Sequence, residues 1–414
     1  MKLFTKIINC AVLFLLSIYL IKLPLFSGAS LPLLDLLLLL AIAVNLWTLW
    51  RNNTYKPFEL TVSHRLLWLG IFLILLPFIL NILLKFNHSD WISSLGLLKS
   101  FFVLPILFAF SLALLLRKNY FSLQSLWWSY FLGTLLTSTI AFFYFWNNQL
   151  TFDHRLQAFY NSPNFLAFTL STGILVGIYL INQRFFLTKT TRFLAILIIL
   201  GQLFLLWQAS STGAVIGLSG TLLFWLLIHR YSRYQLFLIF SPLLISFASL
   251  IFLTNLSLFL EKIDYNPSIP PSSIDSRIAI YQSAQKIWQN NFWLGVGLGE
   301  FQTNYLENQT FFTPYPQWAV PHAHNLLLHF TVEGGFIALT GITLILFIFF
   351  TNQIKNLYLS TLILMPYLLL HGLVDMSIWK NDLAVLFWLI IFISIYSNKK
   401  PVLFTDWLNT KTKQ

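Results

Sequence analysis

The sequence has few charged residues and almost no cysteine. Only 9% of its 414 residues are charged, whereas 57% are hydrophobic and the mean hydropathy is +0.75. A soluble globular domain carries about 25% charged residues. With 42 phenylalanines and 15 tryptophans, the chain has more apolar surface than a water-soluble core could enclose. The single cysteine, Cys10, excludes an intrachain disulfide. The composition therefore predicts an all-α polytopic membrane protein.

A net charge of +12 is typical of proteins that bind nucleic acid, but here the basic residues form short clusters between apolar runs. We therefore expect no nucleic acid and interpret the clusters as loops flanking membrane helices. Crossing the hydrocarbon core takes about 20 apolar residues. The sequence predicts about twelve such helices, centred on residues 7–24, 30–50, 65–85, 97–116, 125–146, 164–182, 193–208, 212–229, 235–256, 323–350, 357–374 and 381–397.

The basic residues also predict an orientation. If the N-terminus is cytoplasmic, most of the 25 lysines and arginines fall in cytoplasmic segments, so both termini are expected in the cytoplasm. Lys2 and Lys6 could instead begin a signal peptide, but we favour an uncleaved first helix because a second apolar run follows at once. The resulting division is nine membrane helices over residues 1–256, a far-side loop over 257–321, and three helices with a cytoplasmic tail over 322–414.

The far-side loop contains a polar, charge-bearing segment. From Asp275 to Asn290 the pattern predicts one amphipathic helix, with Asp275 or Ser276 as its N-cap. Arg277 near its start could bind a phosphate together with the helix dipole, although an ion pair with Asp275 would also explain it. Three glycines follow, at 295, 297 and 299. No strand precedes them, so they indicate a tight turn rather than a phosphate-binding loop.

A group of histidines follows the loop. His322, Asn325, His329 and Glu333 are spaced by three, four and four residues, which would place them on one helix face, with His324 at the mouth. Ionisable residues at membrane depth are costly and mark functional sites. Interfacial histidines bonded to loop carbonyls would give the same pattern. A zinc site could begin at His322-x-His324, but no cysteine or second carboxylate pair has matching spacing, so no metal is expected.

Other polar residues fall on the same predicted side of the membrane. Arg155 lies in a short loop where basic residues are scarce. His371, Asp375 and Lys380 lie near the end of the eleventh predicted helix. These three residues could line the same cavity as the histidines or pair with one another.

The pattern Ser276-Arg277, Tyr281, Gly295-x-Gly297-x-Gly299-x-Phe301 and His324-Asn325 before Gly335 resembles the O-antigen ligase family. Its superfamily also contains O-antigen polymerases and protein O-oligosaccharyltransferases. The predicted twelve helices and the one large periplasmic loop between the ninth and tenth helices fit the same likeness.

The resemblance implies a metal-independent, inverting glycosyltransferase of the bacterial inner membrane, with no cofactor. Such an enzyme moves a glycan from undecaprenyl pyrophosphate onto lipid A–core at the periplasmic face. On this basis His324 is the catalytic residue and Arg277 binds the pyrophosphate. Ligases usually carry a second arginine in a Ser-Arg-Gly-like turn, where this chain has Thr212. Either Arg155 or Lys380 replaces it, or the donor or acceptor differs. The expected supporting residues are His322, Asn325, Glu333, Asp375 and Lys380.

The chemistry of the side chains agrees with this expectation. A sugar pyrophosphate leaves as a stable anion and needs nearby positive charge, while an acceptor hydroxyl needs a base such as histidine. Two other enzymes of the superfamily, a polymerase and a protein-glycosylating enzyme, stay open as alternatives. A glycolipid flippase or transporter is a third class. Polar residues concentrated on one side of the membrane favour surface chemistry over transport through a midplane site.

Overall fold

The computed structural model describes residues 1–24, 30–51, 61–85, 91–182, 188–230, 273–308, 320–355 and 359–396. It is helical apart from one short antiparallel pair of strands, β1 (Lys22–Pro24) and β2 (Ser30–Pro32). The helices are α1 (Lys2–Phe14), α2 (Leu33–Arg51), α3 (Val62–Leu84), α4 (Trp91–Leu98), α5 (Leu104–Arg117), α6 (Leu123–Trp146), α7 (Pro163–Asn182), α8 (Lys189–Ala209), α9 (Thr212–Arg230), α12 (Ser273–Asn290), α13 (Phe301–Asn308), α14 (Leu326–Lys355), α15 (Leu359–Gly372) and α16 (Asn381–Tyr396).

Seven helical spans among the described residues are long and apolar enough to cross a membrane, and three shorter apolar helices accompany them. The chain is thus a multi-pass membrane protein with an almost entirely helical fold. The ninth predicted run, 235–256, lies outside the described residues. The count of twelve helices, the loop limits and the sidedness of the chain therefore stay predictions.

The first predicted membrane run, residues 7–24, is not one continuous helix. Helix α1 ends at Phe14, a 3-10 turn covers Leu16–Leu20, and the chain then enters β1. Pro24 disfavours a helical conformation at Leu23, the residue before it, which agrees with the extended backbone of β1. The paired strands close the connection to α2 as a short hairpin.

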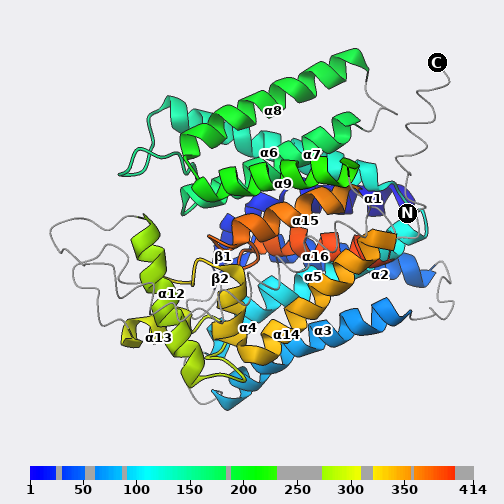
Figure 1. Ribbon diagram of the computed structural model, residues 1–414. Coiled ribbons are helices and arrows are strands. Elements are labelled where there is room, and N and C mark those ends of the chain that lie inside the picture. Colours follow the sequence, from blue (N-terminus) through cyan, green and yellow to red (C-terminus); the bar gives the residue numbers. More distant parts are fainter. Residues whose placement is uncertain are drawn as a thin grey trace.

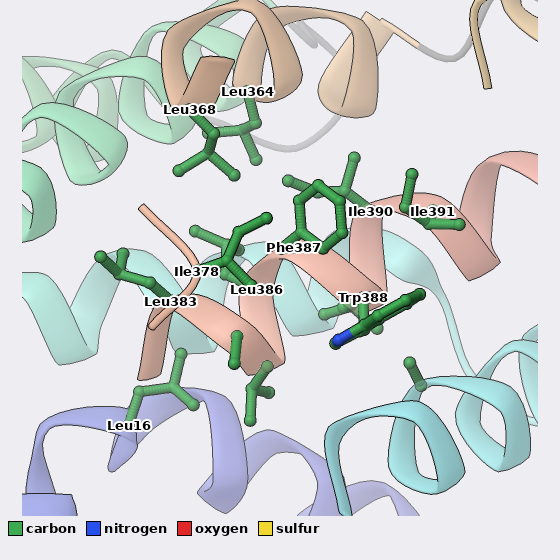
Figure 2. Close-up of a cluster of buried hydrophobic side chains, with 14 of the residues drawn as sticks. Leu16, Leu364, Leu368, Ile378, Leu383, Leu386, Phe387, Trp388, Ile390 and Ile391 are labelled. Carbon is green, nitrogen blue, oxygen red and sulfur yellow. The ribbon is translucent and has the colours of Figure 1, made fainter. Parts of the chain in front are cut away.

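Helix α16 forms the centre of the bundle. Every residue from Asp382 to Tyr396 is buried, and α16 packs against α5, α15, α14 and α3. Figure 2 shows Phe387 and Trp388 among leucine and isoleucine side chains from several helices. The Trp388 Nε1 donates to the carbonyl of Phe101 at 3.2 Å. A helix that is apolar on all sides is expected at such a fully enclosed position.

Helices α3 and α14 cross closely because glycines meet at the crossing. A Cβ added to Gly70 would lie 3.0 Å from the Gly341 carbonyl oxygen, and one added to Gly341 would lie 2.7 Å from the Gly70 oxygen. Small residues allow two membrane helices to bring their backbones together in this way. The crossing fixes the position of α14, whose first turn carries His329 and which directly follows His322 and His324 in the chain.

The amphipathic helix predicted from Asp275 to Asn290 is confirmed as α12. It lies with α13 at one end of the bundle, opposite the end where the N-terminus lies (Figure 1). The predicted N-cap is wrong, because the helix begins at Ser273 and therefore includes Asp275 and Ser276. Its apolar face joins a second hydrophobic cluster, made of Ile280, Ala284, Ile287, Val296, Phe301, Tyr305, Val320, Ala323, Leu328 and Val332.

Candidate functional site

The three-glycine segment forms a turn that docks onto α14. Gly295, Gly297 and Gly299 have φ values of 68°, 102° and 82°, as predicted for a tight turn. The amides of Gly299 and Phe301 donate to Glu333 Oε1 at 3.0 and 3.3 Å. A kink at Gly335 lets the two backbones meet, since a Cβ on Gly335 would lie 2.2 Å from the Trp293 oxygen. The three-glycine turn thus attaches the segment after α12 to the membrane helix α14.

Glu333 contacts His329, one helical turn earlier on α14, and the three-glycine turn rather than His322 or His324. Its Oε2 accepts from Trp379 Nε1 at 3.0 Å and lies 3.5 Å from His329 Nε2. The side chain is almost fully buried. The predicted common helix face is therefore wrong in part, because α14 begins only at Leu326 and His322 precedes it. The reason is the turn that residues 321–325 form before the helix.

His324 lies in this turn, immediately before the start of α14. The Asn325 Oδ1 accepts from the Leu328 amide at 3.0 Å and so caps the helix. His324 has a φ of 47°, a left-handed conformation that is uncommon for a residue other than glycine. Such backbone outliers cluster at functional sites. Its side chain is 25% exposed, so the ring can be reached from outside.

Asp375 follows α15 and meets this turn. Its Oδ1 lies 3.4 Å from His324 Nδ1, an ion-pair contact longer than a well-formed hydrogen bond. Oδ1 also accepts from the Met376 amide at 2.8 Å, and Oδ2 accepts from Asn164 Nδ2 at 2.5 Å. The carboxylate is buried and held from three directions, with one oxygen directed at His324.

Helix α12 brings Arg277 to the same place. Arg277 Nε donates to the Val374 carbonyl at 3.1 Å, one residue before Asp375. The Tyr281 hydroxyl contacts the carbonyls of His324 at 3.1 Å and Leu373 at 3.3 Å. Arg277 and His324 therefore lie at the same end of the bundle, because α12, which carries Arg277, contacts the turn that contains His324.

Arg155 approaches from another side through Asn164. Its guanidinium NH2 group donates to Asn164 Oδ1 at 2.9 Å, and Asn164 in turn donates to Asp375. Its Nε donates to the carbonyl of Ala209 at 3.0 Å. Ala209 is the last residue of α8, directly before the two-residue turn that leads to Thr212, the first residue of α9. The arginine thus lies at the turn where the family resemblance leads us to expect a second cation.

Burial and charge shift the pKa values of two members of this group. Burial of the His322 ring and the neighbouring His324 lower the pKa of His322 to about 3. Burial alone would raise the pKa of Asp375, but its contact with His324 and the nearby His322 outweigh burial and lower the pKa. At neutral pH, His322 is therefore neutral and Asp375 is ionised.

Lys380 and His371 are buried beside the group but do not contact His324. The Lys380 ammonium lies 3.8, 4.4 and 5.1 Å from the ring centroids of Phe165, Tyr160 and Tyr19. It has no hydrogen-bond partner among the described residues, and burial lowers its pKa to about 8. The His371 ring stacks on Phe168 with centroids 3.6 Å apart. Both are enclosed by aromatic rings.

One ligand atom each from His322, His324 and Asp375 lies within 4.8 Å of the other two. Two imidazoles and a carboxylate can hold a transition-metal ion. Sequence spacing did not reveal this group, because the histidine pattern lacked a third ligand and Asp375 joins it only in the folded chain.

An apolar groove of about 860 Å³ runs between α6 and α8. Its lining includes Phe131 and Leu135 of α6 and Ile198, Gly201 and Leu205 of α8. A Cβ added to Gly201 would meet nothing within 4 Å. One residue of the groove lining, Leu205, lies one helical turn before Ala209 and therefore one helical turn from the carbonyl that binds Arg155.

Two contributors were missed by the sequence reasoning. No role was predicted for Asn164, yet it joins Arg155 to Asp375. Trp379 was not considered, although its indole N–H binds Glu333. A second asparagine in Asn161-Ser162-Pro163-Asn164, beyond what a cap needs, was the available signal for Asn164.

Comparison with known proteins supports the likeness seen in the sequence. No curated protein matches the chain. Residues 194–343 match the family described as O-antigen ligase. The matched region begins in α8 and ends in α14, so it includes Arg277, the three-glycine turn and His324. Over this region the chain is similar to the O-antigen ligase family.

Proposed function

We propose that the chain transfers a glycan from undecaprenyl pyrophosphate onto lipid A–core at the periplasmic face of the bacterial inner membrane. The observation that carries this proposal is the convergence of His324, Asp375, Arg277 and Arg155 at one end of the bundle. A base held by a carboxylate and two guanidinium groups are the parts that attack on a sugar pyrophosphate requires.

In the proposed reaction the acceptor hydroxyl attacks the anomeric carbon from the face opposite the pyrophosphate. The new carbon–oxygen bond forms as the bond to the pyrophosphate oxygen breaks, so the configuration inverts. The hydroxyl proton passes to Nε2 of His324, because Nδ1 faces Asp375. The resulting imidazolium is stabilised by the Asp375 carboxylate, and no metal ion is needed.

Arg277 and Arg155 bind the pyrophosphate in this proposal. Guanidinium groups bind phosphate oxygens in a planar, bidentate manner. Arg155 supplies the second cation at the turn where Thr212 cannot, since its Nε binds the Ala209 carbonyl at the same turn. The buried Lys380, by contrast, is surrounded by aromatic rings, which favours Arg155 as the replacement.

The lipid tail of the donor occupies the groove between α6 and α8. The lining is mostly apolar and the volume of about 860 Å³ is large enough for several isoprene units. Leu205 of the groove lining lies one helical turn before Ala209, whose carbonyl binds Arg155, so the pyrophosphate of a lipid in the groove is placed toward this arginine. A glycine at 201, where a side chain would meet no neighbour, keeps the groove wide.

The test is transfer by the purified full-length protein from a defined lipid-linked glycan to lipid A–core. His324→Ala should abolish transfer while the protein level in the membrane stays normal. His154→Asn, in the exposed loop beside Arg155, is the matched histidine control and should remain active. Undiminished transfer by His324→Ala would remove the proposed base from the mechanism.

Product analysis separates the related functions. A ligase attaches the glycan to lipid A–core, whereas a polymerase joins it to a second lipid-linked glycan and a protein-glycosylating enzyme joins it to a polypeptide. Disruption of the gene adds an independent readout. Loss of a ligase leaves core-only lipopolysaccharide with lipid-linked glycan accumulating, and loss of a flippase traps that intermediate in the cytoplasmic leaflet.

A further inference from the structure

Two histidines and a carboxylate form a compact cluster, made of His322, His324 and Asp375. Their ligand atoms lie within 4.8 Å of one another, and the two imidazole centroids are 4.4 Å apart. The Nδ1 atoms of both histidines are buried and make no hydrogen bond within the described residues. Buried polar atoms are normally satisfied. His322 Nδ1 has no partner among the described residues, and the 3.4 Å contact of His324 Nδ1 with Asp375 Oδ1 is longer than a well-formed hydrogen bond. Both nitrogens therefore keep the capacity to bind a metal ion.

The spacing of these atoms suits a tetrahedral ion. Zinc binds imidazole nitrogen and carboxylate oxygen at about 2.0–2.2 Å, which places neighbouring ligand atoms about 3.3–3.5 Å apart in a tetrahedron. The 3.4 Å between His324 Nδ1 and Asp375 Oδ1 already equals this edge. His322 completes the set by a side-chain rotation, since its ligand atom lies within 4.8 Å of the others.

The surroundings of Asp375 resemble those of a metal ligand. Asn164 holds Oδ2 at 2.5 Å and the Met376 amide holds Oδ1 at 2.8 Å. Groups that fix a ligating carboxylate in this way strengthen metal binding. His324 is 25% exposed, so an ion can enter, and a water molecule can fill the fourth position.

We propose that His322, His324 and Asp375 bind one Zn²⁺ ion and that the bound ion inhibits glycan transfer. Binding stands on the cluster alone, whereas inhibition rests on the function proposed above. A neutral imidazole that ligates zinc through Nδ1 carries its proton on Nε2. It cannot then accept the proton of the acceptor hydroxyl, so the ion disables the base without displacing it.

A direct binding experiment tests the site. Zn²⁺ is titrated into the full-length protein, freed of metal with a chelator, and heat or a competing metal indicator reports binding. We expect one ion per chain and at least a tenfold loss of affinity in His322→Gln. Asn164→Ala, which removes a group that positions Asp375, should weaken binding less. His154→Asn, which changes the histidine of the exposed loop, should bind zinc as the wild type does.

Transfer assays test the inhibition. Zinc should reduce the wild-type rate, and a chelator should restore it. In His322→Gln the zinc concentration that halves the variant's own rate should rise at least tenfold. Equal zinc affinity in wild type and His322→Gln would overturn the site, and loss of wild-type transfer on chelation would overturn inhibition. If the wild type transfers no glycan at all, the function proposed above fails while the binding titration still decides the site.

Discussion

Replacing Asp375 with asparagine tests the contact on which the reaction depends most. The change removes one charge and keeps the shape of the side chain. The carboxylate lies 3.4 Å from His324 Nδ1, and its side chain is 3% exposed, whereas that of His324 is 25% exposed. Two unit charges at this distance attract by about 1 kcal/mol in water and about 5 kcal/mol at an effective dielectric constant of about 20.

Because the His324 ring is partly exposed to water, we take an attraction of about 3 kcal/mol between the imidazolium and the carboxylate. Losing this attraction in Asp375→Asn corresponds to a reduction of about 100-fold in kcat. The amide introduced by Asp375→Asn also has one acceptor oxygen where the carboxylate uses two, for Asn164 and for the Met376 amide. One buried donor is therefore left unpaired, and the free energy of unfolding should fall by about 1–3 kcal/mol.

The assay is the rate of transfer per folded protein. Loss of the carboxylate disfavours the imidazolium that forms during transfer, so kcat should fall while the protein stays folded. Asp35→Asn is the control, because Asp35 is equally buried in an ion pair with Lys99 and has no described contact with His324. It should lower the melting temperature and leave kcat per folded protein unchanged. A kcat within twofold of wild type in Asp375→Asn would refute the reasoning.

Three further changes test other parts of the structure. Gly201→Trp should slow transfer from a long-chain polyprenyl donor at least tenfold and leave transfer from a short-chain donor unchanged. Gly96→Trp is the control and should show no such difference, because a Cβ at Gly96 also meets nothing within 4 Å. Equal slowing of both donors by Gly201→Trp would contradict the binding of the lipid tail in the groove. Glu333→Gln should lower the free energy of unfolding by about 1–3 kcal/mol in thermal denaturation, because one amide oxygen replaces two acceptors; an unchanged melting temperature would contradict this role. Burial lowers the pKa of Lys380 in the folded chain to about 8, whereas its pKa in the unfolded chain is about 10.4. Between these two pH values the unfolded chain binds more protons than the folded chain, so the free energy of unfolding of the wild type should rise with pH. Lys380→Met should lack this rise, and an identical pH dependence in both proteins would contradict the assignment.

Local patterns in the sequence were sufficient to predict α12 and the glycine turn. The apolar positions Ile280, Ala284 and Ile287 repeat at helical spacing and are buried, and the three glycines adopt positive φ. These features depend on neighbouring residues alone. The expected closeness of Arg277 and His324 came from the family likeness rather than from spacing, and in the fold Arg277 contacts residue 374, next to the aspartate that faces His324.

The rest of the site depends on contacts between distant parts of the chain. Asn164 and Asp375 are 211 residues apart in sequence, yet Asn164 Nδ2 lies 2.5 Å from Asp375 Oδ2 in the fold. No periodicity relates them, so Asp375 could be named only as one of several polar residues near a helix end. The shared helix face assigned to His322 and Glu333 was wrong because helical spacing was extended across the residues before Leu326, although Asn325 is a residue type that favours the N-cap position.

The anchoring of α12 uses side-chain donors on the helix and main-chain oxygens as acceptors. Arg277 and Tyr281 bind the carbonyls of residues 374, 324 and 373. Every amino acid offers the same carbonyl, so evolution can exchange Leu373 and Val374 freely as long as the backbone path persists. A library randomised at these two positions should yield many active clones, whereas one randomised at 277 and 281 should yield few.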